Sequence, residues 1–320
     1  MSSPVWQSPP TIRASAPDEV EAALVGADGT RLYVRRRGAL PGARPNAPLA
    51  LLCDGIACDG FIWKYLWDDL ARIGPVAHWH YRGHGRSAPP MDPNKVQVVD
   101  YAADLDAIRK QLGDPPVVLI GHSFGVQVAL EAYRTRPEGI AALVLCCGAS
   151  GRVTETFKGT TILAQVLPKI VAWSTQYPEL ARAIWSRVPT DLSLKLSYVL
   201  REVDVENMRP DDLMPYLRHM TTIDFPFFAR SLMAAGEHDA ADMLATIAVP
   251  TLVIIAERDS FSPQDRAKAL AAAIPGSESL VLKNGSHAAL IEQPEITYAR
   301  IGEFIQRVAS AEAARVSLAG

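Results

Sequence analysis

Short apolar runs alternate with helical stretches over the first half of this sequence, and this alternation limits the folds that the chain can adopt. The apolar runs are bounded by glycine, proline or aspartate and occupy residues 49–53, 76–79, 117–120 and 141–147. Helical periodicity separates them at 61–73, 98–112 and 124–136. Because neighbouring parallel strands need a long crossover, usually a helix, the pattern predicts a mostly parallel sheet with helices on both faces.

The regions on either side of this alternation differ from it. Residues 20–38 alternate apolar and polar side chains around an Asp-Gly turn, which predicts a hairpin at the sheet edge. From about 150 to 243 the strand pattern is absent, and amphipathic segments broken by proline predict a helical insertion. Strands are expected again at 250–255 and 279–282, followed by a helix from 295 to about 308.

The predicted organisation is one core interrupted by a cap. Residues 1–19 form a proline-rich lead-in, 20–149 and 244–320 build the core, and 150–243 form the cap. Aromatic residues are spread along the cap, where they would line a substrate cavity if the cap lies over the strand ends. Each aromatic residue alone is better explained by core packing, so none is assigned to substrate binding.

Composition and charge exclude several classes of protein. The 320 residues carry a formal net charge of −3, which gives no long-range field to gather nucleic acid or an anionic membrane surface. The longest apolar stretch, 140–149, has about half the length of a bilayer span, so no membrane span is expected. The first residues lack the pattern of a secretory signal. The four cysteines lie in or beside apolar runs, and no histidines stand at a metal-ligand spacing from them. These features predict a cytoplasmic protein with reduced, buried thiols and no metal site.

A glycine-flanked serine stands at one strand-to-helix junction. Gly121, His122, Ser123, Phe124 and Gly125 follow a predicted buried strand and precede a predicted helix. A nucleophilic serine in a sharp, strained turn needs small neighbours, which Gly121 and Gly125 supply. The free N–H of Phe124 at the start of the helix could donate to a developing oxyanion. The alternative is a plain turn in which the serine caps the helix.

After the first 20 or so residues, the sequence resembles the α/β-hydrolase superfamily, especially its capped esterases and lactonases. The resemblance rests on the order of strands, on the Gly-His-Ser-Phe-Gly turn, and on an acid and a histidine late in the chain. The resemblance implies an α/β-hydrolase fold with an eight-stranded sheet. It also implies a triad of Ser123 as nucleophile, His287 as general base and Asp259 as the orienting acid. Asp259 and His287 each follow a predicted strand, at the end where open parallel sheets place catalytic groups. Glu257 and Asp265 remain alternatives for the acid.

The same resemblance assigns an oxyanion hole, with one departure from the family pattern. Relatives carry His-Gly after the first parallel strand, whereas this sequence has Asp-Gly, followed by Ile56. The resemblance implies that the N–H of Ile56 donates beside that of Phe124. A carboxylate facing an oxyanion would oppose catalysis, so Asp54 is expected to point away, bound to backbone N–H groups or to an arginine such as Arg82. A chemical role for Asp54 or Asp59 is the alternative.

Together these residues predict a cofactor-free serine hydrolase. Ser123 would attack the carbonyl of a small apolar ester or lactone, His287 would move the proton, and water would release the acyl group. The sequence contains no dinucleotide-binding glycine fingerprint and no P-loop. The alternatives are a ligand or signal receptor on the same scaffold, and perhydrolysis or carbon–carbon bond hydrolysis by the same triad. The pattern favours no particular oligomeric state.

Overall fold

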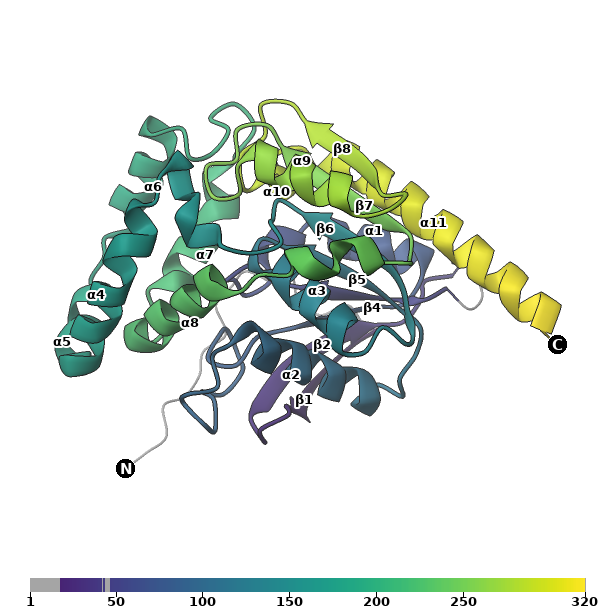
Figure 1. Ribbon diagram of the computed structural model, residues 1–320, viewed down its shortest axis with the longest axis horizontal. Coiled ribbons are helices and arrows are strands. Elements are labelled where there is room, and N and C mark those ends of the chain that lie inside the picture. The colour runs from purple at the N-terminus through teal and green to yellow at the C-terminus, as the bar shows by residue number, and fades with distance from the viewer. Residues whose placement is uncertain (1–17, 42, 44–46, 320) are drawn as a thin grey trace.

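The computed structural model describes residues 18–41, 43 and 47–319, so most of the predicted lead-in, 1–19, lies outside the described residues. An eight-stranded sheet forms the centre of the molecule, in the order β1-β2-β4-β3-β5-β6-β7-β8 (Figure 1). The strands are β1 (Glu19–Val25), β2 (Arg31–Arg37), β3 (Leu49–Cys53), β4 (Val76–Trp79), β5 (Val117–His122), β6 (Ile140–Cys146), β7 (Thr251–Ala256) and β8 (Glu278–Leu282). β1 pairs with β2 and β2 with β4 in antiparallel fashion, and all other neighbours are parallel. The predicted edge hairpin and mostly parallel sheet are therefore confirmed.

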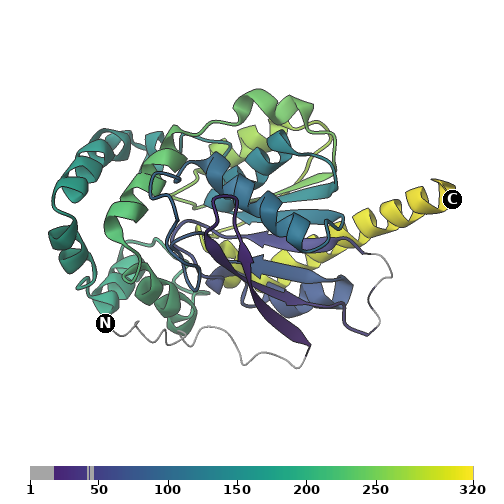
Figure 2. The same cartoon turned by 90° about the horizontal axis from the view of Figure 1, so that it is seen from below.

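Helices cover both faces of the sheet (Figure 2). One layer consists of α2 (Val98–Gln111), α3 (Phe124–Thr135) and α9 (Gln264–Ala273), and the other of α1 (Leu66–Ile73), α10 (Ala289–Glu292) and α11 (Pro294–Ala319). Successive strand residues point to opposite faces, so on β3 Leu51 packs with the first layer and Leu52 with the second. Burial on both faces explains why the central strands are continuous apolar runs.

Five α-helices are inserted between β6 and β7 and project from one end of the core (Figure 1). They are α4 (Ile162–Gln176), α5 (Pro178–Trp185), α6 (Thr190–Val199), α7 (Pro210–Met220) and α8 (Phe225–Glu237). A β-bridge between Gly151 and Asp239 brings the two ends of the insertion together. α4 and α5 pack on α8, and α6 packs on α7. α7 is attached to the core through the buried Asp212, which accepts hydrogen bonds from Lys64 and Tyr65.

The helices differ from the predicted segments in several places. The last helix, α11, continues to Ala319 instead of ending at about 308. The predicted helix over 61–73 is interrupted, because a 3-10 turn at Phe61–Trp63 precedes α1. α7 begins at Pro210, since proline suits the first helical position, and it continues through Pro215. The sequence pattern predicts a helical insertion here but gives no separate bounds for α6 or α8. α8 is buried on several sides, which hides the 3.6-residue period of an amphipathic helix.

The cysteines occupy the core, as their apolar sequence context predicts. All four are free and buried. The predicted strand over 141–147 ends one residue early, at Cys146, because Cys147 has a φ of 48°. Within the described ranges, no helix combines the length and hydropathy needed to cross a bilayer.

A buried ion pair joins the loop after β4 to α2 and to the edge hairpin. The Arg82 guanidinium donates to both carboxylate oxygens of Asp104, at 2.8 and 2.7 Å, and to Asp28 at 3.0 Å. Asp104 also accepts a hydrogen bond from the N–H of Ala27 at 2.9 Å. The side chains of Arg82 and Asp104 are 1% and 0% exposed, so water solvates neither charge. Each member of this pair therefore depends on the other.

We expect Arg82→Met to lower the free energy of unfolding by about 3–5 kcal/mol, because it leaves the Asp104 carboxylate buried without its counter-ion. Urea denaturation measures this loss. The double variant Arg82→Met/Asp104→Asn should regain part of it, since the charge that needs the arginine is gone. A double variant less stable than the sum of the two single effects would contradict the pairing.

Candidate active site

Ser123 occupies the sharp turn between β5 and α3, with φ 56° and ψ −118°. A positive φ is strained for a residue that carries a side chain. The surrounding backbone is close: a Cβ on Gly125 would lie 2.1 Å from the carbonyl oxygen of Cys53, and one on Gly121 would lie 2.3 Å from that of Gly125. The two glycines are therefore required by direct backbone contact, in the strand, turn and helix arrangement that the sequence predicts.

Ser123, His287 and Asp259 form one chain of hydrogen bonds. The Nε2 atom of His287 lies 2.8 Å from Ser123 Oγ, and its Nδ1 lies 2.9 and 2.8 Å from the two carboxylate oxygens of Asp259. The loops that carry the acid and the histidine follow neighbouring strands, and the N–H of Arg258 donates to the carbonyl of Gly285 between them. Three residues that are far apart in the sequence thus meet at the carboxyl end of the sheet.

Backbone groups hold the Asp259 carboxylate in place. Its Oδ1 accepts hydrogen bonds from the N–H groups of Phe261, at 2.9 Å, and Ser262, at 2.8 Å, and its side chain is fully buried. The ring of Phe261 stacks on that of His287, with 4.8 Å between centroids. These contacts orient the imidazole so that Nδ1–H donates to Asp259 and the lone pair of Nε2 faces Ser123.

The two other acids considered for this role are turned elsewhere. The carboxylate of Glu257 accepts a hydrogen bond from the N–H of Asn284 at 2.9 Å. Asp265 lies in the first turn of α9, where a negative charge stabilises the helix. Neither is bonded to His287 in the described part of the chain, so the geometry favours Asp259.

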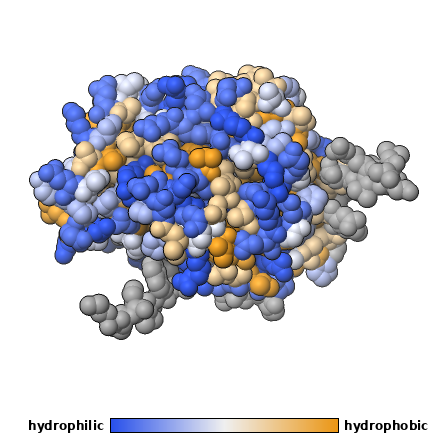
Figure 3. All heavy atoms as spheres, turned by 60° about the horizontal axis from the view of Figure 1, so that its bottom comes forward, coloured by the Kyte–Doolittle hydropathy of each residue, from blue (hydrophilic) through white to orange (hydrophobic). Residues whose placement is uncertain are grey.

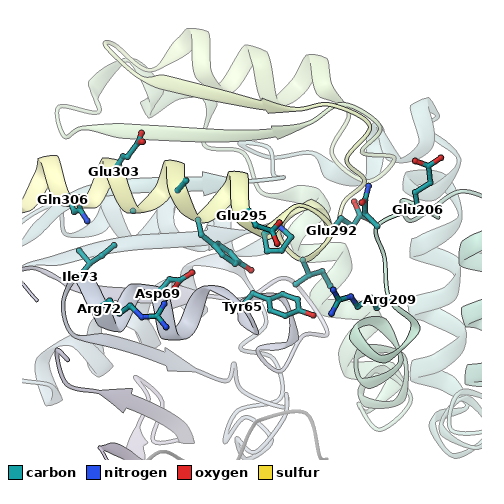
Figure 4. A pocket seen from close by; sticks show the side chains of 16 residues that line it. Tyr65, Asp69, Arg72, Ile73, Glu206, Arg209, Glu292, Glu295, Glu303 and Gln306 are labelled. Atoms are coloured by element: carbon teal, nitrogen blue, oxygen red, sulfur yellow. Dashed lines mark hydrogen bonds and ion pairs between the residues drawn. The ribbon is translucent and has the colours of Figure 1, made fainter. Parts of the chain in front are cut away.

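A buried glutamate that sequence reasoning missed supports the histidine loop. Glu292 on α10 accepts hydrogen bonds from the N–H of Ser286, at 2.9 Å, from the Ser286 hydroxyl, and from the N–H of Asp204 in the insertion, at 2.8 Å. Figure 4 shows Glu292 in the wall of a surface groove of about 870 Å³, which extends toward the insertion residues Glu206 and Arg209. Ser123 does not line this groove. Nothing in the local sequence distinguishes Glu292 from a solvated helix residue, so only the fold identifies it.

His122 also supports the histidine loop. Its Nε2–H donates to the backbone carbonyl of His287 at 2.9 Å. Burial, together with the charge of the protonated His287, lowers the pKa of His122 to about 4. His122 is therefore neutral at physiological pH and can donate this bond without adding a charge beside Ser123.

The predicted oxyanion donors, Ile56 and Phe124, both lie on backbone beside Ser123. Phe124 is the first residue of α3, and a Cβ built on Gly55 would lie 3.3 Å from the Cβ of Ser123. Among the described residues, the N–H groups of Ile56 and Phe124 have no hydrogen-bond partner. Two free donors beside a serine could stabilise an oxyanion if one developed there.

Asp54 points away from Ser123, as expected, but the expected arginine partner is wrong. Its carboxylate accepts hydrogen bonds from Trp63 Nε1 at 2.6 Å and from His78 Nε2 at 2.9 Å, while Arg82 binds Asp104 instead. The hydroxyl of Tyr81 donates to the Asp54 carbonyl at 2.8 Å. His78 becomes a neighbour of Asp54 only because β3 and β4 pair side by side, which sequence separation hides. Asp54 is thus clamped at side chain and backbone, directly before the loop that carries Ile56.

Asp59, further along the same loop, is a buried carboxyl with few partners. Its Oδ1 is buried without a hydrogen bond among the described residues, and its Oδ2 lies 3.9 Å from Nδ1 of His219 on α7. Burial, assisted by the negative charge of Asp54, raises the pKa of Asp59 to about 7. Burial also lowers the pKa of His219 to about 4, so this histidine is neutral when Asp59 ionises and does not compensate its charge.

We expect Asp59→Asn to raise the melting temperature at pH 8.5 and to do so less at pH 5.5. Folded Asp59 keeps its proton up to about pH 7, whereas an aspartate in the unfolded chain loses it near pH 3.9. The wild-type free energy of unfolding therefore falls as the pH rises through this window, and the asparagine variant lacks this loss. Thermal unfolding of both proteins across the pH range measures the effect. Asp191→Asn, at an exposed site, is the control, and a gain from Asp59→Asn that does not grow with pH would count against the buried acid.

Comparison with known proteins gives the family of the chain. The model of the alpha/beta hydrolase fold family matches residues 51–294. A candidate carbamate hydrolase named RutD from Klebsiella pneumoniae (strain 342) is 25% identical over 256 residues, which cover 78% of this chain and 87% of RutD. The structure of an esterase from Exiguobacterium antarcticum is similar with a TM-score of 0.70, at 18% identity, over 90% of this chain and 100% of that one.

A second solved structure has a related fold and another substrate. The enol-lactonase from Burkholderia xenovorans LB400 is similar with a TM-score of 0.63, at 20% identity, over 89% of this chain and 99% of that one. At such identities the two structures bear on the fold alone. The family model, in contrast, covers well over half of the sequence. This protein therefore belongs to the alpha/beta hydrolase fold family.

Proposed function

We propose that this protein is a cofactor-free serine hydrolase that cleaves carboxylic esters or lactones through an acyl-enzyme. One observation carries the proposal: the unbroken hydrogen-bond chain from Ser123 Oγ through His287 to the buried Asp259. A serine hydroxyl is a poor nucleophile at neutral pH, and a histidine in this position activates it. The strained turn at Ser123 presents the hydroxyl beside two free backbone donors, which such chemistry also needs.

In the proposed reaction, Ser123 Oγ attacks the carbonyl carbon of the substrate while its proton moves to His287 Nε2. The C–O double bond opens to an oxyanion, and the N–H groups of Ile56 and Phe124 donate to it. Collapse of this intermediate breaks the bond to the leaving oxygen, which takes the proton from Nε2. Water then attacks the acyl group with His287 again as base, which restores the serine and releases the acid.

The surroundings of the loop support this use of the two donors. The Asp54 carboxylate is held by Trp63 and His78, so its charge does not face the developing oxyanion. Asp59 is protonated below about pH 7, which keeps a second negative charge out of the same loop.

The helices of the insertion are proposed to form a cap that governs substrate size. Tyr216 on α7 stacks on Phe61, next to the oxyanion loop, with 4.8 Å between centroids. This contact brings an aromatic residue of the insertion close to the loop that carries Ile56. The likeness to RutD makes carbamates a further substrate class to test, because they offer the same carbonyl to Ser123. Four free, buried cysteines suit a reducing compartment, and we propose a cytoplasmic location.

We expect Ser123→Ala and His287→Ala each to reduce ester turnover by at least about a thousandfold, because the members of a triad act as one unit. A panel of p-nitrophenyl esters, lactones and carbamates of graded acyl length measures turnover, and circular dichroism checks the fold. A fluorophosphonate probe should label the wild type and not Ser123→Ala. Labelling that survives this substitution, or wild type that binds esters without releasing product, would refute the proposal.

We expect Asp259→Asn to reduce kcat by about four orders of magnitude with little change in KM, since an imidazole without its carboxylate adopts the wrong tautomer. Glu257→Gln is the matched control and should keep near-normal turnover. Steady-state kinetics with the best ester of the panel distinguish the two. If Glu257→Gln lost activity while Asp259→Asn retained it, the acid would be misassigned although the serine and histidine would stand.

A further inference from the structure

The helices α4 to α6 expose an unusual amount of apolar side chain. Eighteen large hydrophobic side chains are exposed in the described part of the chain, and eleven of them lie between Ile162 and Val205. In Figure 3 the insertion lies at the left, where apolar residues reach the surface between hydrophilic ones. Scattered exposed apolar residues need no explanation, but this concentration on three consecutive helices does.

On α4 the exposed apolar residues form one stripe. Ile162, Val166, Trp173 and Tyr177, the last directly after the helix, are spaced by four, seven and four residues, which puts them on one side of the helix. The side that packs on α8 is different and includes the buried Leu167. The stripe therefore lies beside the contact that attaches α4 to the protein and stays exposed.

α5 and α6 repeat this arrangement. On α5, Leu180 and Ile184 are 52% and 55% exposed. On α6 the exposed residues are Leu192, Leu196 and Val199, and Leu200 directly after the helix is exposed too. Leu194 and Tyr198 are half-buried and pack against the core. We call the ten exposed residues on these three helices or directly after them the cap face: Ile162, Val166, Trp173, Tyr177, Leu180, Ile184, Leu192, Leu196, Val199 and Leu200.

The cap face lies in a basic part of an acidic chain. Residues 157–201 contain six lysines and arginines and two acidic residues, although the whole chain has a net charge of −3. Lys169 is three residues after Val166 and four before Trp173, and Lys195 stands in the same relation to Leu192 and Val199. Lysines at this helical spacing lie beside the apolar stripes.

These cations are available to a partner. Lys169, Arg187, Lys195 and Arg201 are exposed, and no ion pair of theirs occurs within the described residues. By contrast, Arg182 is paired with Glu179 and Asp224. The net negative charge of the chain argues against binding to an anionic surface. At short range, however, only the charges near the contact count, because salt screens charges that are more than about 8–10 Å away.

We propose that the cap face docks this protein on an anionic lipid surface. Aliphatic residues with a tryptophan and a tyrosine, flanked by unpaired lysines whose stems can lie along the apolar surface, suit the boundary between headgroups and acyl chains. The centre of a protein–protein interface is instead depleted in lysine. The inference does not depend on the proposed catalytic chemistry, because it concerns binding by residues outside the triad and the oxyanion loop.

Sedimentation of the full-length protein with vesicles tests the inference. At about 0.1 M salt the wild type should bind phosphatidylglycerol vesicles at least about tenfold more tightly than phosphatidylcholine vesicles, since each exposed lysine near an anionic surface is attracted to it. Leu192→Gln/Leu196→Gln should weaken binding to both kinds of vesicle by at least about tenfold, because two leucines that would enter the lipid are lost. Lys169→Glu/Lys195→Glu should abolish the preference for phosphatidylglycerol.

Val20→Gln/Val25→Gln is the matched control, because these two valines are 50% and 53% exposed but lie on β1, outside the insertion. It should bind vesicles like the wild type. All variants should keep their melting temperature, their labelling by the fluorophosphonate probe and their turnover of a soluble ester.

Three results would overturn the inference. Wild type that ignores phosphatidylglycerol vesicles, or cap-face variants that bind them like wild type, would exclude lipid docking. A wild-type dimer in light scattering that Leu192→Gln/Leu196→Gln converts to a monomer would assign the cap face to a second copy of the chain. Loss of probe labelling with intact vesicle binding would instead count against the proposed function alone.

Discussion

The close contact between the turn at Ser123 and the end of β3 is the constraint on which the rest of the site depends. The backbone of Gly125 lies so near the Cys53 carbonyl that any side chain at position 125 would collide with it. This contact brings the loop after β3 against the start of α3, so that the free N–H groups of Ile56 and Phe124 both lie beside the serine. A strained turn can persist here because the strands and helix around it are buried and tightly packed.

The histidine loop is held by contacts from several separate elements. Asp259 binds the imidazole, Phe261 stacks on it, His122 binds the His287 carbonyl, and Glu292 binds the preceding Ser286. Each contact comes from a different position in the sequence, and all converge because parallel strands end at one edge of the sheet. A group held in this way loses little freedom when substrate arrives, which is the advantage of a preorganised site.

The aspartate that replaces the usual histidine shows how a departure from a family pattern can be accommodated. The Asp54 carboxylate is buried with Trp63 and His78, and its carbonyl is bound by Tyr81. These bonds fix Asp54 directly before the loop that carries Ile56. Glu292 is also a buried carboxylate that joins two parts of the chain, because its bond to Asp204 connects the histidine loop to the insertion.

The sequence by itself determined the architecture of this protein and the position of the glycine-flanked serine that we propose as nucleophile. Strand and helix periodicity, two glycines around a serine, and an acid and a histidine after late strands are local patterns, because each depends on neighbours within a few residues. Only the tertiary structure decided which side chains became partners across the sheet. It separated Asp259 from Glu257, paired Asp54 with His78 rather than Arg82, and gave Glu292 its role. These outcomes depend on strand pairing and loop contacts between residues distant in sequence, and no local pattern encodes them.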